Sequence, residues 1–366
     1  MLFRLARNSG KILLALVQGE LKRSDSKMDL HLPVPKVTTE DALRVARGAA
    51  EQLLADLSHA ELLTDYWTNQ NLGLLLVGAA MDRCLAKLAE TGWMGSANQL
   101  ISSEFWRVAG NRLRCGRLQL RAREKPRGYA GDFETIQLFY ENSICDDPLG
   151  RLFDRYFQQQ TAVEAVRARI ELVASCLLDA ATQRPQERAF RIASIGSGPA
   201  IEIQLAMQLL PDECREAVRI DLFDLDQDAL EHAAARIGPM LSARQMQTHR
   251  ENLYRLAEST SAIAALRDCN FVFCTGLFDY LSDEAAVRFM KFLYDSLAPG
   301  GRLMVGNFAP HNPSRTYMEW IGNWYLLYRD ANDLARLAAR AGIPIERLRV
   351  RPERTGIDLF LSADRV

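Results

Sequence analysis

The chain has 366 residues, of which 48% are hydrophobic and 25% are charged, and this is ordinary for a globular protein long enough for two separate cores. Its 45 Lys and Arg residues against 46 Asp and Glu residues give a formal net charge of −1, so no overall positive field attracts nucleic acid. The seven cysteines stand singly and the five histidines lie apart, which argues against a disulfide framework and a metal site and predicts a reducing, cytoplasmic location.

Residues 1–36 are predicted to form an N-terminal extension and linker. Basic side chains dominate the first 23 residues, in which Glu20 is the single acid. The apolar run 12–17 is too short to span a bilayer. We expect a frayed extension, and the alternative is a basic amphipathic helix in weak contact with an anionic membrane surface. Pro33 and Pro35 predict an extended linker before the first domain.

Residues 37–185 have the pattern of a helical cap domain. A helix is expected to open at Thr39, because apolar residues at Leu43, Ala49, Leu53 and Leu57 fit a period of 3.6. A second, strongly apolar helix is predicted over 72–88, and a basic helix over 104–120. The arginines of the basic helix indicate a solvated face.

The loop 123–134 combines glycines, a proline, charges and aromatic residues between two predicted helices. Loops of this composition often carry function, and we expect Arg127 or Tyr129 to face a ligand as part of an active-site wall. The plainer interpretation is a helix connection in which Asp132 caps a helix over 133–140. Both interpretations can hold together.

The stretch 191–202 is typical of a nucleotide-binding opening. A strand-like run at 191–195 leads into Gly196, Ser197 and Gly198, and a helical pattern begins at Ile201. Glycine lets the backbone turn sharply or approach a ligand closely, and a helix N-terminus offers unpaired N–H groups to an anion. Strand, turn and helix in this order predict the start of a doubly wound sheet.

The next predicted strand, 218–224, ends in Asp224, where a ribose diol would lie across the switch point of the sheet. An amphipathic helix capped by Asp226 follows. A dinucleotide-dependent dehydrogenase would prefer a third glycine at position 201, where this chain has Ile201. The sequence therefore favours an adenosyl cofactor over a dinucleotide.

A third group of elements completes the pattern. A buried strand at 270–274 is followed by a loop, a helix over 283–297, a turn at 298–301 and a strand over 302–308. In order and spacing, residues 188–310 resemble the class I S-adenosylmethionine-dependent methyltransferases. The resemblance implies an α/β fold, with a Rossmann-like seven-stranded methyltransferase domain over 186–366 and an α-helical N-terminal domain. It also implies S-adenosyl-L-methionine as cofactor, contacted by Gly196, Ser197, Gly198, Asp224, Leu225, Asn252, Thr275, Gly276 and Tyr280.

The chain departs from the family pattern at three positions. Ser194 stands where many members carry an acid, so Glu202 or main-chain carbonyls would have to hold the methionine amine. Ala200 replaces the third glycine of the loop. Asn252 replaces an aspartate that often follows the third strand, and its amide can still hydrogen-bond the adenine edge.

Two segments carry a narrower resemblance. Residues 125–134 (KPRGYAGDFE) and 307–320 (NFAPHNPSRTYMEW) are similar to PhcB-type methyltransferases, and the similarity runs over about 40–362. This resemblance implies methyl ester formation on a 3-hydroxy fatty acid used in quorum sensing. Related members can act on other acids.

The kind of acceptor decides which catalytic groups are needed. A carboxylate, with a pKa near ~4.5, is ionised at neutral pH and needs orienting donors and a dry pocket. A hydroxyl or amine acceptor needs a base. His311, which follows the strand 302–308, could donate to a carboxylate, act as a base, or hold the loop through a backbone carbonyl. Asn307, Arg127, Tyr129 and Tyr317 are the other acceptor-side candidates.

Aromatic residues recur over 317–328 and predict a helix with an aromatic face at 317, 320, 321, 324 and 328. Such a face is more often core than substrate wall. As a wall for an acyl tail, it would gain about 0.8 kcal/mol per buried CH₂ group. A helix over 331–341 ended by Gly342, and strands over 346–352 and 357–362 with a turn at 354–356, are expected to close the sheet.

These observations favour an enzyme that methylates the carboxylate of a small or fatty acid, with a small-molecule substrate, no metal and no nucleic-acid partner. The oligomeric state stays open. N- or O-methylation of another natural product is the alternative enzyme. A module that binds S-adenosylmethionine without catalysis is the alternative of another class, and Ser194 and Ala200 lend it support.

Overall fold

The computed structural model describes residues 34–66, 68–183 and 189–366, so all but the end of the expected N-terminal extension lies outside the described residues. The chain divides into two compact units. Unit 1 comprises Met1–Glu164 with Asn312–Leu326, and unit 2 comprises Ala165–His311 with Leu327–Val366. Within the described ranges, no helix is both long enough and apolar enough to cross a membrane.

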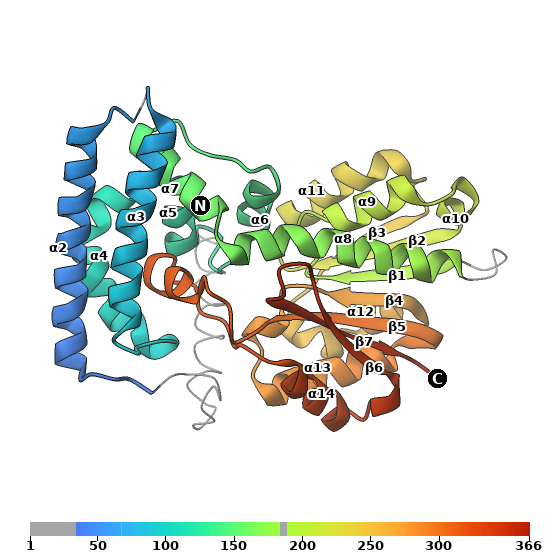
Figure 1. Cartoon of the computed structure of the whole chain (residues 1–366). Helices are drawn as coiled ribbons and strands as arrows, with labels where there is room; N and C mark the ends of the chain where they lie inside the picture. The colour runs from blue at the N-terminus through green and yellow to red at the C-terminus, as the bar shows by residue number, and fades with distance from the viewer. Residues whose placement is uncertain (1–33, 67, 184–188) are drawn as a thin grey trace, which may run out of the picture. The chain divides into compact units, whose positions relative to one another are not determined.

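Unit 1 is built from helices (Figure 1). They are α2 (Thr39–Leu63), α3 (Gln70–Ala89), α4 (Gln99–Leu113), α5 (Arg117–Glu124), α6 (Phe133–Tyr140) and α7 (Pro148–Gln158), with the short turns η1 (Ser96–Asn98) and η5 (Tyr317–Ile321). The predicted opening of the first helix is confirmed, because the Thr38 hydroxyl accepts the Asp41 N–H at 3.2 Å. The buried face of α2 includes Ala46, Leu53 and Leu57, whose spacing follows the helical period and packs α2 on α3 and α4.

The predicted basic helix over 104–120 is wrong, because the chain forms two helices, α4 and α5, in its place. Gly116 lies between them with extended backbone. A Cβ atom at Gly116 would lie 2.8 Å from the Cβ atom of Phe153 in α7, so only glycine lets the chain turn there. The arginines continue past the break and hide it in the sequence. The expected solvated face is present, since Arg107 pairs with Glu104 at the surface.

The predicted helix over 317–328 is also wrong. Only η5 is helical, as one wide turn closed by the Gly322 N–H, which donates to the Tyr317 carbonyl at 3.2 Å. Asn323 then adopts a φ of 50°, which ends the helix. The Leu327 N–H donates to the Asp279 carbonyl at 2.7 Å. Tertiary hydrogen bonds therefore replace the helical ones, and the expected continuous aromatic face does not form.

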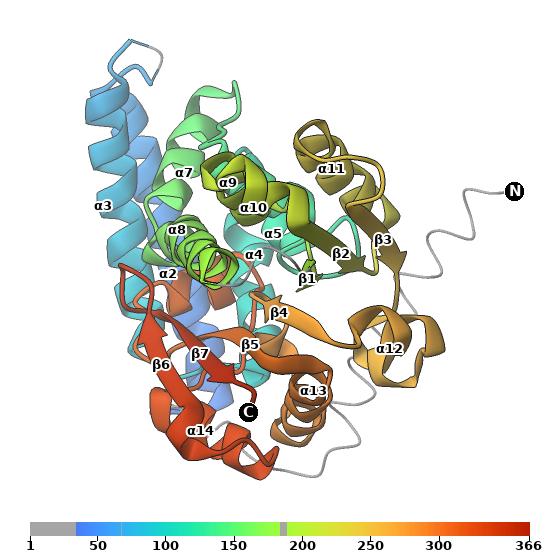
Figure 2. The ribbon, with the colours of Figure 1, turned by 90° about the vertical axis from the view of Figure 1, so that its right-hand side faces the viewer.

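Unit 2 holds a seven-stranded sheet in the order β3-β2-β1-β4-β5-β7-β6 (Figures 1 and 2). The strands are β1 (Phe190–Ile195), β2 (Val218–Asp224), β3 (Met246–Arg250), β4 (Cys269–Cys274), β5 (Leu297–Phe308), β6 (Leu348–Pro352) and β7 (Asp358–Asp364). Strands β1 to β5 are parallel, and β7 is antiparallel to both of its neighbours. This confirms the predicted α/β, Rossmann-like seven-stranded fold with a helical N-terminal region. The strand order reverses between β1 and β4, which makes the carboxyl ends of these strands the switch point.

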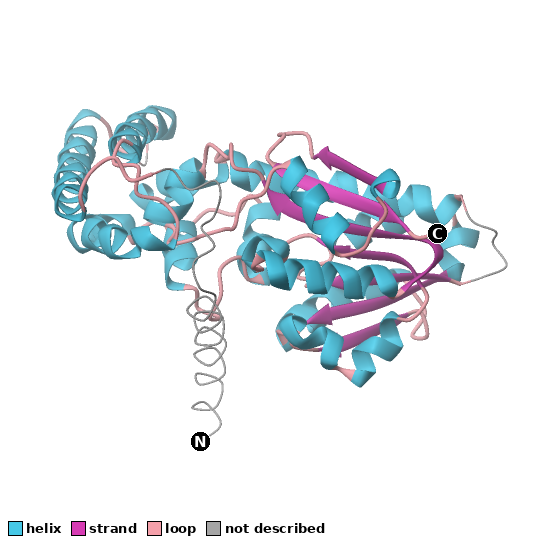
Figure 3. Cartoon of the chain, turned by 90° about the horizontal axis from the view of Figure 1, so that it is seen from below, coloured by secondary structure: helices cyan, strands magenta, loops and turns pink. Residues whose placement is uncertain are grey.

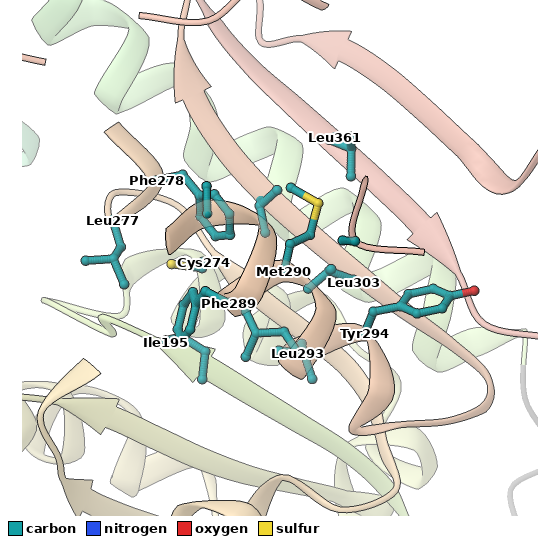
Figure 4. Packing of buried hydrophobic residues seen from close by; sticks show 14 of the residues in the cluster. Ile195, Cys274, Leu277, Phe278, Phe289, Met290, Leu293, Tyr294, Leu303 and Leu361 are labelled. Carbon is teal, nitrogen blue, oxygen red and sulfur yellow. The ribbon is translucent and has the colours of Figure 1, made fainter. Parts of the chain in front are cut away.

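Helices cover both faces of the sheet (Figure 3). One face carries α8 (Thr161–Thr182), α9 (Ile201–Leu209), α10 (Asp212–Ala217) and α11 (Gln227–Ile237), and the other carries α12 (Thr260–Leu266), α13 (Asp283–Asp295) and α14 (Ala331–Arg340). Short turns η2 (Gly238–Met240), η3 (Leu253–Glu258), η4 (Phe278–Tyr280) and η6 (Ile345–Arg347) connect them. Figure 4 shows the core between the sheet and helices α12, α13 and α14, with Phe278, Met290 and Leu303 among its buried side chains. Burying each such side chain contributes about 1.5–3 kcal/mol, which fixes the strand ends that carry the site.

The closing elements follow the prediction with shifted bounds. Helix α14 is followed by Gly342, whose φ of +80° lets the chain leave the helix. Strand β6 begins after η6, later than expected, and β7 continues to Asp364. Gly356, with a φ of +87°, makes the predicted turn, and its N–H donates to the Glu353 carbonyl at 3.0 Å.

Candidate active site

The glycine turn after β1 is tied to the end of β2. The N–H groups of Gly196 and Ser197 both donate to the Phe223 carbonyl, at 2.8 and 3.1 Å. Gly196 and Gly198 adopt φ values of +70° and +48°, and a Cβ atom on Gly198 would meet nothing within 4 Å. The conformation requires glycine, and the backbone at Gly198 borders open space that a ligand can enter.

Helix α9 begins directly after this turn. Its N-cap is Ala200, which adopts a φ of 53° and has no side-chain acceptor. The first N–H groups of α9 therefore have no capping side chain from this residue, and such groups can bind an anion. Ala200 thus adopts the left-handed backbone that a glycine would adopt there. This conformation costs alanine more free energy than it costs glycine.

Asp224 lies at the end of β2, beside the glycine turn. Its Oδ2 atom accepts the Gly198 N–H at 3.1 Å and its Oδ1 atom accepts the Asp226 N–H at 3.0 Å. Burial raises the pKa of Asp224, while the hydrogen bonds from Asp226 and Gly198 lower it. Each carboxylate oxygen has a second lone pair for a further donor. The structure therefore brings Gly198 and Asp224 together, as the sequence spacing predicts.

Leu225 and Asn252 lie next to this carboxylate along the sheet edge. The Glu251 N–H donates to the Asp224 carbonyl at 2.9 Å, which joins the ends of β3 and β2. Asn252 caps η3 by accepting the Tyr254 N–H at 3.1 Å. Both Leu225 and Asn252 are half-buried. Asn252 therefore lies just after β3, one strand along the edge from Asp224, and its contact with an adenine ring stays a prediction.

The loop after β4 contributes Thr275, Gly276 and Tyr280. Thr275 is buried, Gly276 is exposed, and Tyr280 is half-buried at the end of η4. The Arg169 guanidinium donates through Nη1 to the Thr275 carbonyl at 3.2 Å. Because β4 neighbours β1 in the sheet, this loop and the glycine turn flank the same switch point.

Asn307, predicted to orient an acceptor, lies in a buried hydrogen-bond network. Its amide nitrogen lies 3.0 Å from Asp279 Oδ1 and 2.9 Å from the Leu327 carbonyl. Its amide oxygen accepts from Arg329 at 2.8 Å. These contacts hold the start of the segment that follows β5, and they engage both ends of the Asn307 amide within the protein.

Asp279 is the centre of this network. It is fully buried, and its Oδ1 atom also accepts the Phe308 N–H at 2.8 Å. Burial raises its pKa to about 6, against lowering contributions from the Phe308 hydrogen bond and from Arg329 and Arg169. Sequence reasoning did not single out Asp279, because an acid in a short loop carries no pattern of its own.

His311 is exposed, and its Nε2 atom lies 3.1 Å from the Gly356 carbonyl. This contact matches the loop-holding role among the three roles considered for this residue. It links the segment after β5 to the turn between β6 and β7. A direct role of His311 toward an acceptor stays a prediction.

Arg127 and Tyr129 belong to unit 1, where an ion pair and a cation–π contact stabilise the loop 123–134. The Arg127 guanidinium donates to Glu134 and stacks on Phe133, 4.5 Å from its centroid. Asp132 caps α6 by accepting the Thr135 N–H at 2.9 Å, which confirms the predicted helix connection. Facing a ligand stays a prediction for Arg127 and for the half-buried Tyr129.

Tyr317 is buried in unit 1, and its hydroxyl donates to Gln119 Oε1 at 2.9 Å. Its ring packs edge-on against Phe157, with centroids 5.3 Å apart. Trp320 is fully buried, and its ring packs edge-on against Phe105 with centroids 6.5 Å apart. These contacts agree with the core interpretation of the aromatic residues.

Two charged residues of unit 2 that the sequence reasoning missed meet at the carboxyl edge of the sheet. Arg169 of α8 has its Nη1 atom 3.7 Å from Asp358 Oδ2, the first residue of β7. Both side chains are buried. The one available signal was that Arg169 shares a helical face with Ala165, Val166 and Val173, since charged residues are rarely buried without a partner.

The edge as a whole is acidic. Burial is the largest cause of a raised pKa for Glu202, Asp224 and Asp358, as it is for Asp279, and Arg169 lowers the pKa of Glu202, Asp279 and Asp358. When these acids are ionised, the edge attracts a ligand with positive charge. Among the described residues, no group of three His, Cys, Asp or Glu side chains is placed to hold a metal ion.

No protein-family model matches the chain, and no curated protein matches it. Among solved structures, a possible exported protein from Bordetella parapertussis is similar at 17% identity and a TM-score of 0.52, covering 90% of this chain and 99% of that one. This likeness shows a shared fold. The magnesium protoporphyrin IX methyltransferase from Synechocystis with bound S-adenosylhomocysteine is similar at 17% identity and a TM-score of 0.42, covering 64% and 100%. The pyocyanin biosynthetic protein PhzM is similar at 14% identity and a TM-score of 0.43, covering 98% and 99%.

Proposed function

We propose that this protein is an S-adenosyl-L-methionine-dependent methyltransferase. The observation that carries the proposal is the Asp224 carboxylate, bonded to the Gly198 N–H at the switch point of a sheet with the methyltransferase strand order. A dinucleotide is disfavoured because Ile201 stands where a third glycine would be needed.

The residues at this edge fit the cofactor. Asp224 has lone pairs for the ribose hydroxyls, and Asn252 lies next along the edge for the adenine. The backbone at Gly196, Ser197, Thr275 and Gly276 would border the methionine end. When bound, the cofactor supplies an electrophilic methyl group on a sulfonium, whose positive charge suits the buried acids of the edge.

The favoured acceptor is the carboxylate of a small or fatty acid. A carboxylate is already ionised at neutral pH, so the protein has to align it in line with the methyl group and exclude water. With the cofactor bound, the carboxylate oxygen would form the new O–CH₃ bond as the S–CH₃ bond breaks, and the electron pair of that bond would stay on sulfur. No proton moves in this step, which agrees with an exposed His311 that is engaged by a backbone carbonyl.

A 3-hydroxy fatty acid is the specific acceptor that we propose, for the biosynthesis of a methyl ester signal. The support is the PhcB-type resemblance of segments 125–134 and 307–320. On the same resemblance, Arg127, Tyr129 and Tyr317 stay candidates for acceptor binding, with 37–185 as the helical cap domain and 186–366 as the methyltransferase domain.

One observation favours a second acceptor class. A hydroxyl or amine acceptor needs a base with a pKa near the working pH, and burial raises the pKa of Asp279 to about 6. N- or O-methylation of another natural product would then use Asp279. A rate that rises with pH through about 6 would favour this class, whereas a carboxylate acceptor requires no such rise.

The proposed function is tested by calorimetric titration with S-adenosylmethionine, followed by incubation with methyl-labelled cofactor and a panel of fatty and 3-hydroxy acids. Product masses should show methyl esters together with S-adenosylhomocysteine. Cofactor binding without any product would instead indicate a binding module that has lost catalysis. Binding of a nicotinamide dinucleotide in place of S-adenosylmethionine would refute the proposal.

A further inference from the structure

Asp358, which lies beside Arg169, is an unsatisfied buried acid at the carboxyl edge of the sheet. Asp358 is 0% exposed, and neither of its carboxylate oxygens has a hydrogen-bond partner among the described residues. The Arg169 Nη1 atom, at 3.7 Å, is too distant for a hydrogen bond. A buried carboxylate without donors costs about 1–3 kcal/mol or more, so its presence calls for an explanation.

The fold holds this pair firmly in place. The Asp358 N–H donates to Glu353 Oε1 at 3.1 Å, and Glu353 also accepts two donors from Thr355 and thereby fixes the turn before β7. On the other side, Arg169 donates to the Thr275 carbonyl at the end of β4. The Arg169 guanidinium is therefore hydrogen-bonded to the end of β4 and lies beside the first residue of β7.

The place of the pair on the sheet assigns it to the acceptor side. Asp224 ends β2, and β4 lies two strands away, or about 10 Å at a strand spacing of about 4.8 Å. Strand β7 lies four strands from β2, or about 19 Å. Asp358 pairs with Phe308 at the carboxyl end of β5. A ligand that extends from Asp224 across the ends of β1 and β4 would therefore approach the region of Arg169 and Asp358.

We propose that Arg169 and Asp358 bind the methyl acceptor, an acid with a hydroxyl group close to its carboxylate. The Arg169 guanidinium donates to the acceptor carboxylate, since arginine offers donors in a planar fork that matches a carboxylate. The acceptor hydroxyl donates to Asp358, which supplies the donor that this carboxylate lacks. The inference rests on the proposed function and adds to it the residues that select 3-hydroxy acids over unsubstituted acids.

The methionine end of the cofactor has a related pattern, a carboxylate beside an ammonium donor. The same pair could hold that end instead, with the ammonium on Asp358. Substitutions of Arg169 and Asp358 distinguish the two ligands. They would change cofactor affinity if the pair binds the methionine end, and acceptor affinity and selectivity if it binds the acceptor. Both quantities are measurable on the full chain.

Three variants test the assignment: Arg169→Lys, Arg169→Met and Asp358→Asn. The matched controls are Arg302→Lys and Asp364→Asn, because Arg302 of β5 and Asp364 of β7 form an ion pair at the other end of β7. For each variant we would measure the Kd of S-adenosylmethionine by calorimetry. Steady-state KM and kcat would be measured for a 3-hydroxy fatty acid and for the unsubstituted acid of equal length.

We expect Arg169→Met to raise KM for both acids at least tenfold, and Arg169→Lys to do so less. Asp358→Asn should remove most of the preference for the hydroxylated acid, because a site built to bond a hydroxyl loses selectivity when that contact changes. Cofactor Kd should stay within about twofold of wild type, and the control variants should match wild type in all three quantities. If Asp358→Asn does not fold, as judged by circular dichroism, the graded effect of the two Arg169 variants remains the test.

Several outcomes would overturn the inference. A rise in cofactor Kd with unchanged acceptor KM would assign the pair to the methionine end. An unchanged KM and selectivity in an active, cofactor-binding protein would leave the proposed function standing and remove Arg169 and Asp358 from the site. The wild-type protein could also bind cofactor but show no acid binding by calorimetry and no methylated acid by mass. That result would refute the proposed acid substrate, and with it the role of Arg169 and Asp358 in acceptor binding.

Discussion

At the residue scale, the buried carboxylate of Asp224 links the structure to the proposed ligand. It accepts backbone donors from Gly198 and Asp226, yet burial still raises its pKa. Donors from a ribose diol would stabilise the ionised form further. Asp224 therefore gains more from a bound cofactor than an exposed acid would.

Replacing Asp224 with alanine should weaken the binding of S-adenosylmethionine about tenfold to a hundredfold. A hydrogen bond to a charged group contributes about 1.5–3 kcal/mol, and every 1.4 kcal/mol is about a factor of ten. The exposed Asp228 of α11 provides the control, and Asp228→Ala should bind cofactor as wild type does. Calorimetric titration measures both, and an unchanged affinity of the Asp224 variant would refute its assignment to the ribose.

Asp279 gives a prediction for stability against pH. Burial raises its folded pKa from 3.8 to about 6, so between these pH values the folded state binds more protons than the unfolded state. Stability therefore falls as pH rises through this window, because the proton must leave a buried group. Asp279→Asn should lose this decline. Urea unfolding at pH 4 and at pH 7 for both proteins measures it, and parallel curves for the two would contradict the prediction.

At the element scale, local turns set the length of each helix and strand. Gly116 separates α4 from α5 because its missing Cβ leaves room for Phe153. Asn323 ends η5 through a positive φ. Gly196 ties the glycine turn to the end of β2. In each case one residue with an unusual backbone conformation or contact decides where an element stops.

Adding a methyl group at Gly116 should destabilise the protein by about 1–3 kcal/mol, the usual cost of overpacking. Gly48 of α2 is the matched control, because a Cβ atom there would meet nothing within 4 Å. Gly48→Ala should instead stabilise by about 0.5–1 kcal/mol, since alanine favours a helix. Urea unfolding midpoints test the pair, and equal midpoints for the two variants would show that Phe153 yields without cost.

At the scale of the whole molecule, the chain combines a helical unit with a seven-stranded sheet unit. The buried acids and few buried arginines at the carboxyl edge of the sheet give that edge an excess of negative charge when the acids are ionised. A cationic ligand that binds only the folded protein offsets this charge and adds stability through mass action.

Saturating S-adenosylmethionine should therefore raise the midpoint of thermal unfolding. At a concentration of about one hundred times Kd, the added stability is about 2.7 kcal/mol. S-adenosylhomocysteine lacks the sulfonium charge and should give a smaller shift at equal concentration. A thermal-shift series with both compounds and with NAD measures this, and an equal shift with NAD would argue for the dinucleotide interpretation.

The sequence alone determined the elements whose evidence is local. The strand, glycine turn and helix around Gly196, the position of Asp224 and the cap of α6 by Asp132 all follow from neighbouring residues, because backbone conformation and capping act over a few positions. The tertiary structure alone decided the break at Gly116, the irregular path after η5, and the meeting of Arg169 with Asp358. These depend on contacts between residues far apart in the chain, such as Leu327 with Asp279, and such contacts override local helical preference because burial and hydrogen bonding outweigh it.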